Sequence, residues 1–242
     1  MIPDPILESH EGFTVVRDDL LDGGSKIRAL PRVISGPPRS WVYTSPSSGY
    51  AQYALAISCS MVGHRAVIFT PDRKHPSPVT RATEAAGADV RFVPFGRMSV
   101  LKARARQEVD RLGHEQATLV PIGLALRGVK EALSAVARRL PVSPSEVWVA
   151  CGSGLLTSAL SDAWPDARVN AVAVGMDPPH LNGRHFRLWW APEKFTEDAV
   201  IPPPYPSVSD FDSKVWRFVR EHAEPGALVW NVAGPIAPSP TE

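Results

Sequence analysis

The sequence reads RDDLLDGGSKIRAL at residues 17–30, and the meaning of the chain turns on this stretch. Its lysine, Lys26, follows two glycines and precedes an apolar run that begins a helix. Glycines permit a tight turn close to a ligand because they lack a Cβ atom. The same pattern is typical of a surface lysine in a turn, so its interpretation depends on the segments that follow.

Strand and helix patterns alternate along the rest of the chain. Short apolar runs predict strands at 41–44, 66–69, 89–93, 118–121, 146–150, 169–174 and 228–232. Periodic apolar residues predict helices at 50–62, 79–86, 100–112, 128–140, 155–162 and 212–222. This alternation predicts an α/β fold with open, mostly parallel twisted sheets and flanking helices. The Pro-rich residues 177–209 show no regular pattern, and we expect a functional loop there.

Composition narrows the class of protein. The chain has 242 residues, of which 44% are hydrophobic, and its 26 basic and 25 acidic side chains nearly cancel. Such a chain can bury a sizeable core, and it creates no strong overall field toward nucleic acid or membrane. We expect one compact unit over 1–242, with a small subdomain at about 41–120 inserted between 1–40 and 121–242 as the alternative.

Membrane spans, leaders and metal sites are not expected. No stretch approaches the length of an apolar span, and no charged leader precedes an apolar run, so a cytoplasmic protein is predicted. Cys59 and Cys151 lie in apolar segments without metal-ligand spacing. We therefore expect buried thiols and no metal.

Two Ser/Gly turns follow predicted strands. One is Ser45-Pro46-Ser47-Ser48-Gly49, and the other is Gly152-Ser153-Gly154. In parallel α/β sheets such turns place backbone N–H groups and a helix N-terminus where an anion can bind. Either turn alone is more often only a turn, but their combination with Lys26 is more specific.

Four segments, in this order, resemble the fold-type II pyridoxal-phosphate (PLP) enzymes, especially the aminocyclopropane-carboxylate deaminase and D-cysteine desulfhydrase branch. They are the stretch around Lys26, Ser47-Ser48-Gly49-Tyr50-Ala51, Val120-Pro121-Ile122-Gly123 and Gly152-Ser153-Gly154. The resemblance covers roughly residues 13–175, and the ordered set is more specific than any single motif. It implies a shortened tryptophan synthase beta-like fold with PLP as cofactor.

The resemblance also implies roles for individual residues. Lys26 would be the catalytic lysine that forms a Schiff base with PLP. The implied substrate-binding residues are Ser47, Ser48 and Gly49, and the implied cofactor-binding residues are Lys26, Tyr50, Gly152, Ser153, Gly154 and Thr157.

This sequence departs from the family at three places. Tyr50 stands where the family usually has Asn beside the cofactor hydroxyl. Two leucines follow the phosphate cup in place of Gly and Thr, so that Thr157 would substitute as a donor. The family's Ser or Thr partner of the cofactor ring nitrogen has no match around Asn231-Val232-Ala233-Gly234.

The implied function is that of a PLP-dependent lyase, deaminase or decarboxylase acting at the Cα of an amino acid or amino-acid-like group. One alternative, from a resemblance to short PLP proteins of bacterial viruses, is decarboxylation of a glycyl-modified thymine during DNA modification. The basic helix at 100–112 would then approach phosphate, although a solvated face is the commoner role of such a helix. Another alternative is a non-catalytic PLP-binding remnant. The family also implies a homodimer.

Other polar residues suggest weaker roles. Asp18 and Asp19 would cap the turn before the glycines. His180 and His185, near Asn182 and Arg184, are candidates for substrate contact. A polar and aromatic cluster that runs from Tyr205 to Trp216, and includes Ser207, Ser209, Asp212 and Lys214, is a candidate substrate-facing segment.

Overall fold

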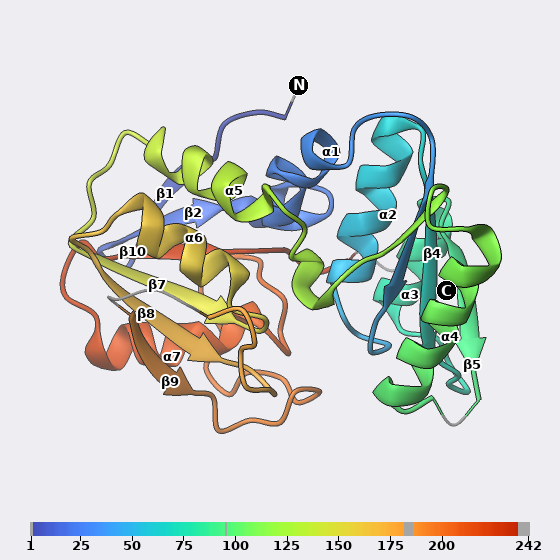
Figure 1. Ribbon diagram of the computed structural model, residues 1–242. Helices are drawn as coiled ribbons and strands as arrows, with labels where there is room; N and C mark the ends of the chain where they lie inside the picture. The colour runs from blue at the N-terminus through green and yellow to red at the C-terminus, as the bar shows by residue number, and fades with distance from the viewer. Residues whose placement is uncertain (1, 95, 182–185, 237–242) are drawn as a thin grey trace. The chain divides into compact units, whose positions relative to one another are not determined.

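The computed structural model describes residues 2–94, 96–181 and 186–236 (Figure 1). The chain divides into two compact units, each with its own sheet. Unit 1 is built from the residues up to Arg28 and from Lys130–Pro235, and unit 2 from Ala29–Val129. Unit 1 therefore combines segments from the two ends of the sequence.

The sheet of unit 1 has six strands in the order β1-β2-β10-β7-β8-β9. Every neighbouring pair is parallel except β1 with β2, which pair antiparallel. The strands are β1 (Leu7–His10), β2 (Phe13–Arg17), β7 (Glu146–Cys151), β8 (Arg168–Ala173), β9 (Phe186–Trp190) and β10 (Leu228–Asn231). The last strand of the chain is thus inserted between the second and the seventh.

Helices cover both faces of this sheet. Figure 1 shows α5 (Val129–Arg138) and α6 (Leu155–Ala163) on one side and α7 (Val215–His222) on the other. Successive residues of β10 point to opposite faces. Val229 belongs to the core that includes Trp216 of α7, whereas the ring of Trp230 lies 6.4 Å from that of Trp164 at the end of α6. Short 3-10 helices complete unit 1: η1 (Asp18–Leu20), η2 (Gly24–Arg28) and η4 (Asp212–Lys214).

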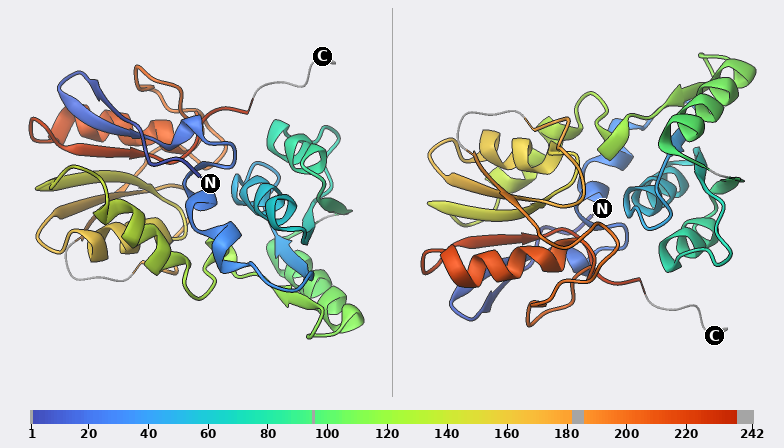
Figure 2. Two further views of the ribbon diagram at one scale, coloured as in Figure 1. Left: turned by 90° about the horizontal axis from the view of Figure 1, so that it is seen from above. Right: turned by 90° about the horizontal axis from the view of Figure 1, so that it is seen from below.

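Unit 2 has a four-stranded parallel sheet in the order β5-β4-β3-β6. Its strands are β3 (Ser40–Thr44), β4 (Arg65–Pro71), β5 (Asp89–Val93) and β6 (Ala117–Leu119), and its helices are α1 (Leu30–Val33), α2 (Ala51–Val62), α3 (Pro78–Ala85), α4 (Met98–Leu112) and η3 (Ile122–Leu124). Figure 2 shows α2 beside α3, while α4 packs on the other face through Leu101, Ala105 and Val109. Both faces of this sheet are therefore covered.

The predicted fold class is confirmed, because parallel sheets with flanking helices form both units. Three strands were not predicted. The β1-β2 hairpin precedes the stretch that began the sequence interpretation, and β9 lies inside residues 177–209, so the expectation of an irregular loop throughout that region was wrong. Among the described residues, no helix is both long and apolar enough to cross a membrane.

Candidate active site

Three segments of unit 1 leave its sheet at one edge. The strands β2, β10 and β7 are neighbours and run parallel, so their carboxyl ends lie side by side. The chain leaves them as residues 18–28, 232–235 and 152–154. Ligands of open α/β sheets bind beyond the carboxyl ends of the strands. This edge brings two of the predicted segments, the one with Lys26 and the one with Gly152, to the place where such a ligand would bind.

Lys26 lies in η2 and is held against the segment after β10. The backbone N–H of Ser25 donates to the carbonyl of Val232 at 2.9 Å. Gly24 has φ +67, and a Cβ atom there would lie 2.5 Å from the same carbonyl oxygen. Lys26 keeps partial exposure to solvent. Nevertheless, desolvation by the surrounding protein lowers the pKa of its ammonium group, against an opposing effect of Asp212.

Asp212 is the carboxylate whose charge acts on Lys26. Its residue is only 5% exposed, and neither carboxylate oxygen has a hydrogen-bond partner of normal geometry among the described residues. Burial raises the pKa of Asp212 well above its usual value; the nearby backbone N–H groups of Val232 and Ala233 and the Lys26 ammonium lower it in part. An unpaired buried carboxyl is costly, which makes Asp212 a candidate for binding a ligand.

Asp18 is enclosed at the start of the Lys26 segment. Its side chain is fully buried and accepts from Arg28 Nε at 2.7 Å and from Trp230 Nε1 at 3.0 Å. The same indole N–H lies 2.9 Å from Ser25 Oγ. These bonds fasten both ends of the segment that carries Lys26 to β10.

Asp19 is also held by basic and amide groups. It accepts from Arg17 through both oxygens, at 2.8 and 2.7 Å, and from Asn231 Nδ2 at 2.7 Å. No side-chain capping bond forms at η1. The expectation that Asp18 and Asp19 cap a turn was therefore wrong, since buried ion pairs use their oxygens instead.

The predicted phosphate cup lies between β7 and α6. Gly154 is the N-cap of α6 with φ +86, and a Cβ atom there would lie 2.5 Å from the backbone nitrogen of Leu181. The space beside Gly154 is thus filled by the chain itself, and His180 N–H donates to the Ser153 carbonyl at 2.7 Å. The Thr157 hydroxyl in the first turn of α6 is buried and has no hydrogen-bond partner of normal geometry among the described residues.

Gly152 connects the cup with the Asp212 segment. A Cβ atom at Gly152 would lie 3.2 Å from the ring of Phe211, the residue before Asp212. Cys151 ends β7 beside the cup; burial raises the pKa of its thiol, and the Thr157 hydroxyl opposes this effect. The cup, Asp212 and Lys26 therefore belong to one continuous set of contacts within unit 1.

Ser47, Ser48, Gly49 and Tyr50 lie in unit 2, in the loop between β3 and α2. The carbonyl of Ser47 accepts from Thr80 Oγ1 at 2.8 Å and from Gln52 Nε2 at 3.0 Å, which fixes the loop against two helices. The ring of Tyr50 meets that of Tyr53 edge-on at 5.8 Å. This loop is ordered by its own unit.

The remaining candidates differ in position. Tyr205 and Ser207 lie at the edge described above: burial, Asp212 and Asp19 raise the pKa of Tyr205, and Ser207 Oγ donates to Asn231 Oδ1 at 2.9 Å. The predicted contact residues Asn182, Arg184 and His185 lie outside the described residues. Of the polar cluster, Asp212 carries the strongest signal of a site, and burial beside a lysine is not visible in the sequence.

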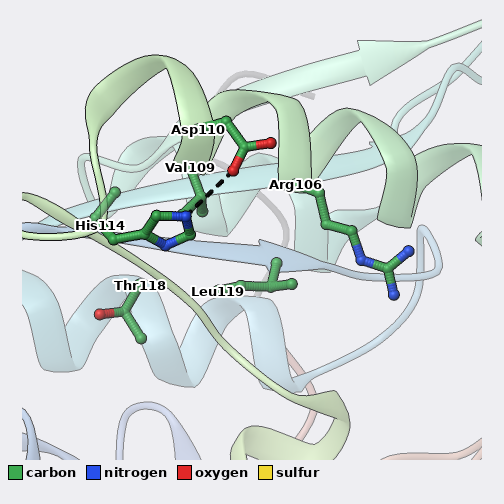
Figure 3. Close-up of a pocket in the computed structure, with 7 residues that line it drawn as sticks. Arg106, Val109, Asp110, His114, Thr118 and Leu119 are labelled. Atoms are coloured by element: carbon green, nitrogen blue, oxygen red, sulfur yellow. Dashed lines mark ion pairs between the residues drawn. The ribbon is translucent and has the colours of Figure 1, made fainter.

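A pocket in unit 2 offers a different candidate (Figure 3). It is lined by residues of α4 and β6 and the turn between them: Arg106, Val109, Asp110, His114, Ala117, Thr118 and Leu119. His114 and Asp110 pair at 3.3 Å while both side chains stay largely exposed, and Arg106 extends away from them. Solvated pairs of this kind are typical of a surface. No predicted site residue lines this pocket.

Comparison with known proteins identifies the fold. No family model matches the sequence, and no curated protein matches it. Solved structures do match. An ACC deaminase homologue has TM-score 0.76 at 15% identity, covering 92% of this chain and 84% of its own. Threonine deaminase from T.th. has TM-score 0.66 at 16% identity, covering 94% and 89%. Diaminopropionate ammonia lyase from Escherichia coli has TM-score 0.65 at 14% identity, covering 92% and 78%.

The fold is that of the fold-type II PLP enzymes. The edge residues of unit 1 fit the chemical groups of PLP. An aldehyde needs an amine with a lowered pKa, as at Lys26; a phosphate needs unpaired donors, as at the first turn of α6; a basic ring nitrogen needs an acid. The orphaned Thr157 hydroxyl and the orphaned Asp212 carboxyl are the observations that carry this fit.

Proposed function

We propose that this chain is a PLP-dependent lyase or deaminase that acts at the Cα of an amino-acid-like substrate, with Lys26 as the lysine that binds the cofactor. The observation that carries the proposal is Lys26 itself. Its amine has a lowered pKa and lies at the carboxyl edge of a parallel sheet, in the fold of PLP enzymes. PLP, when bound, supplies an electron sink for a carbanion at Cα.

The residues of the chain would divide the work as follows. Lys26 Nζ holds the cofactor aldehyde and, once released, moves a proton to or from Cα, which a lysine with a lowered pKa does near neutral pH. The backbone N–H groups of Ser153 and the first turn of α6, with the Thr157 hydroxyl, would bind phosphate. Ser47, Ser48 and Gly49 would bind the substrate carboxylate, and Tyr50 would contact the cofactor hydroxyl.

The decisive experiment is to trap the cofactor on its lysine. Purified protein is incubated with PLP, reduced with borohydride and digested, and the labelled peptide is identified by mass spectrometry. We expect the phosphopyridoxyl mass on Lys26 and its loss in Lys26→Ala. Lys194→Ala, at an exposed lysine whose side chain is 85% accessible, is the control and should keep the label.

Lys214 makes the same experiment more stringent. Lys214 is also buried with a lowered pKa, but its Nζ already donates to the Lys194 carbonyl at 2.7 Å. Labelling of Lys214 in place of Lys26, or no labelling at all, would contradict the proposal. The second result would also remove the non-catalytic PLP-binding alternative.

Reaction products distinguish the remaining alternatives. Ammonia and a keto acid from free amino acids support the deaminase, whereas carbon dioxide from glycyl-modified thymine in DNA supports the decarboxylase. The structure offers the decarboxylase no specific observation. On the basic helix α4, Arg111 is already paired with Glu108 at 2.7 Å, and Arg91 reaches the same carboxylate at 2.9 Å. These arginines are partly neutralised, which favours the solvated-face interpretation.

A further inference from the structure

The segment after β10 lacks a side chain that can serve the cofactor ring. Fold-type II enzymes place a Ser or Thr there, whereas this chain has Val232 and Ala233. An apolar side chain can neither donate a hydrogen bond to a ring nitrogen nor accept one from it. If the fold binds PLP here, the partner of that nitrogen must come from another element.

Asp212 reaches the same place from another part of the chain. It begins η4, directly before α7, and its carboxyl lies near the backbone N–H groups of Val232 and Ala233. It also acts electrostatically on Lys26. The carboxyl is therefore beside the segment that would carry the missing residue and beside the lysine that would hold the cofactor.

Neighbouring carboxylates are already used. Asp18 is bound by Arg28 and Trp230, and Asp19 by Arg17 and Asn231. Asp212 differs, since both of its oxygens are buried without a hydrogen-bond partner of normal geometry among the described residues. Buried polar groups in native proteins are nearly always satisfied, so one without a partner indicates a bound group.

We propose that Asp212 is the partner of the cofactor ring nitrogen in this chain, and that it replaces the residue missing at Val232-Ala233. The inference rests on the proposed function, because it requires PLP at Lys26. A carboxyl kept protonated by burial can share its proton with a ring nitrogen, giving a charge-assisted hydrogen bond in a site of low dielectric. A carboxylate partner for the PLP nitrogen is well precedented chemically.

This partner has a consequence for the reaction. A hydroxyl partner leaves the ring nitrogen neutral, whereas a carboxylate keeps it protonated and makes the ring a stronger electron acceptor. Asp212 would therefore favour reactions that develop full negative charge at Cα. A merely structural role, in which Asp212 only balances the charge of Lys26, would leave the protonation of the ring nitrogen unchanged.

The test reads the ring nitrogen directly. The holoprotein is prepared with PLP labelled with ¹⁵N in the ring, and its ¹⁵N chemical shift is compared in the wild type, Asp212→Asn, Asp212→Glu and the exposed control Asp166→Asn. We expect a protonated nitrogen in the wild type, Asp212→Glu and the control, and a neutral one in Asp212→Asn. The dissociation constant for PLP should rise about 10- to 100-fold in Asp212→Asn, the loss of one hydrogen bond to a charged group.

The outcomes separate this inference from the proposed function. A neutral nitrogen in wild type, or a protonated one in Asp212→Asn, overturns the role of Asp212 while trapping at Lys26 stands. Failure of the wild type to form any adduct overturns both. If Asp212→Asn folds, as judged by circular dichroism, but takes up no PLP while Asp212→Glu does, the requirement for a carboxylate is supported.

Discussion

Replacement of Asp18 by Ala tests whether buried ion pairs hold the Lys26 segment in place. The Asp18 side chain is fully buried and that of Arg28 is 4% exposed, with Nη2 2.6 Å from Oδ1. Removing one partner of a buried pair costs about 3–5 kcal/mol, because the other charge stays buried and unpaired. We expect about 3 kcal/mol here. The lower end applies because Arg28 keeps a bond to the Pro3 carbonyl, and Trp230 keeps Ser25 Oγ.

The measurement is urea unfolding followed by far-ultraviolet circular dichroism. A double-mutant cycle with Arg28→Ala separates the pair from each side chain's other contacts, and a coupling of about 1–3 kcal/mol is expected. Asp166→Ala, at an exposed position, is the control and should change stability by less than about 0.5 kcal/mol. A cost for Asp18→Ala below about 1 kcal/mol, or a coupling near zero, would refute the reasoning.

Two further predictions concern a glycine and a carboxylate. Gly24→Ala should destabilise by about 1–3 kcal/mol more than Gly12→Ala, because both have positive φ but only Gly24 has backbone oxygen 2.5 Å from the added Cβ; equal costs in thermal unfolding would contradict this. The pKa of Glu108 is lowered from 4.5 to about 2, chiefly by hydrogen bonds from Arg111, so its ion pairs stabilise the fold above pH 4.5 and this stabilisation is lost as pH falls toward 2. Glu108→Gln should lower Tm at neutral pH but hardly at about pH 2, whereas the exposed control Glu84→Gln should change it little at either pH; an equal loss at both values would exclude the linkage.

Alternation of strands and helices could be predicted because both sheets are buried on two faces. Parallel strands such as 146–150 are then continuous apolar runs, and the helices that cover them have apolar stripes. The edge strands gave weaker signals. In β9, Arg187 interrupts the apolar run, and its guanidinium stacks 3.9 Å from the centre of the Trp189 ring. Such a strand is recognised only when its neighbour β8 is known.

The candidate site could be predicted only where it depends on local sequence. Lys26 and the turn at Gly152–Gly154 have characteristic neighbours along the chain, so their segments were identified. Asp212 has none. Its character comes from burial and from the proximity of Lys26, which is distant in sequence and contributes from another element. Likewise, Asp18 and Asp19 resembled turn caps because their arginine and tryptophan partners are supplied by tertiary contacts.

Formation of this site depends on the last strand of the chain. β10 lies between β2 and β7, and its residues Trp230 and Asn231 bond Asp18 and Asp19 across 212 positions of sequence. Until β10 is inserted, the Lys26 segment lacks the carbonyl of Val232 that holds Ser25. Long-range parallel pairing forms slowly, because loop closure precedes its gain. The lysine, the unpaired carboxyl and the cup therefore come together only in the completed sheet of unit 1, which keeps a reactive amine from being positioned in a partly folded chain.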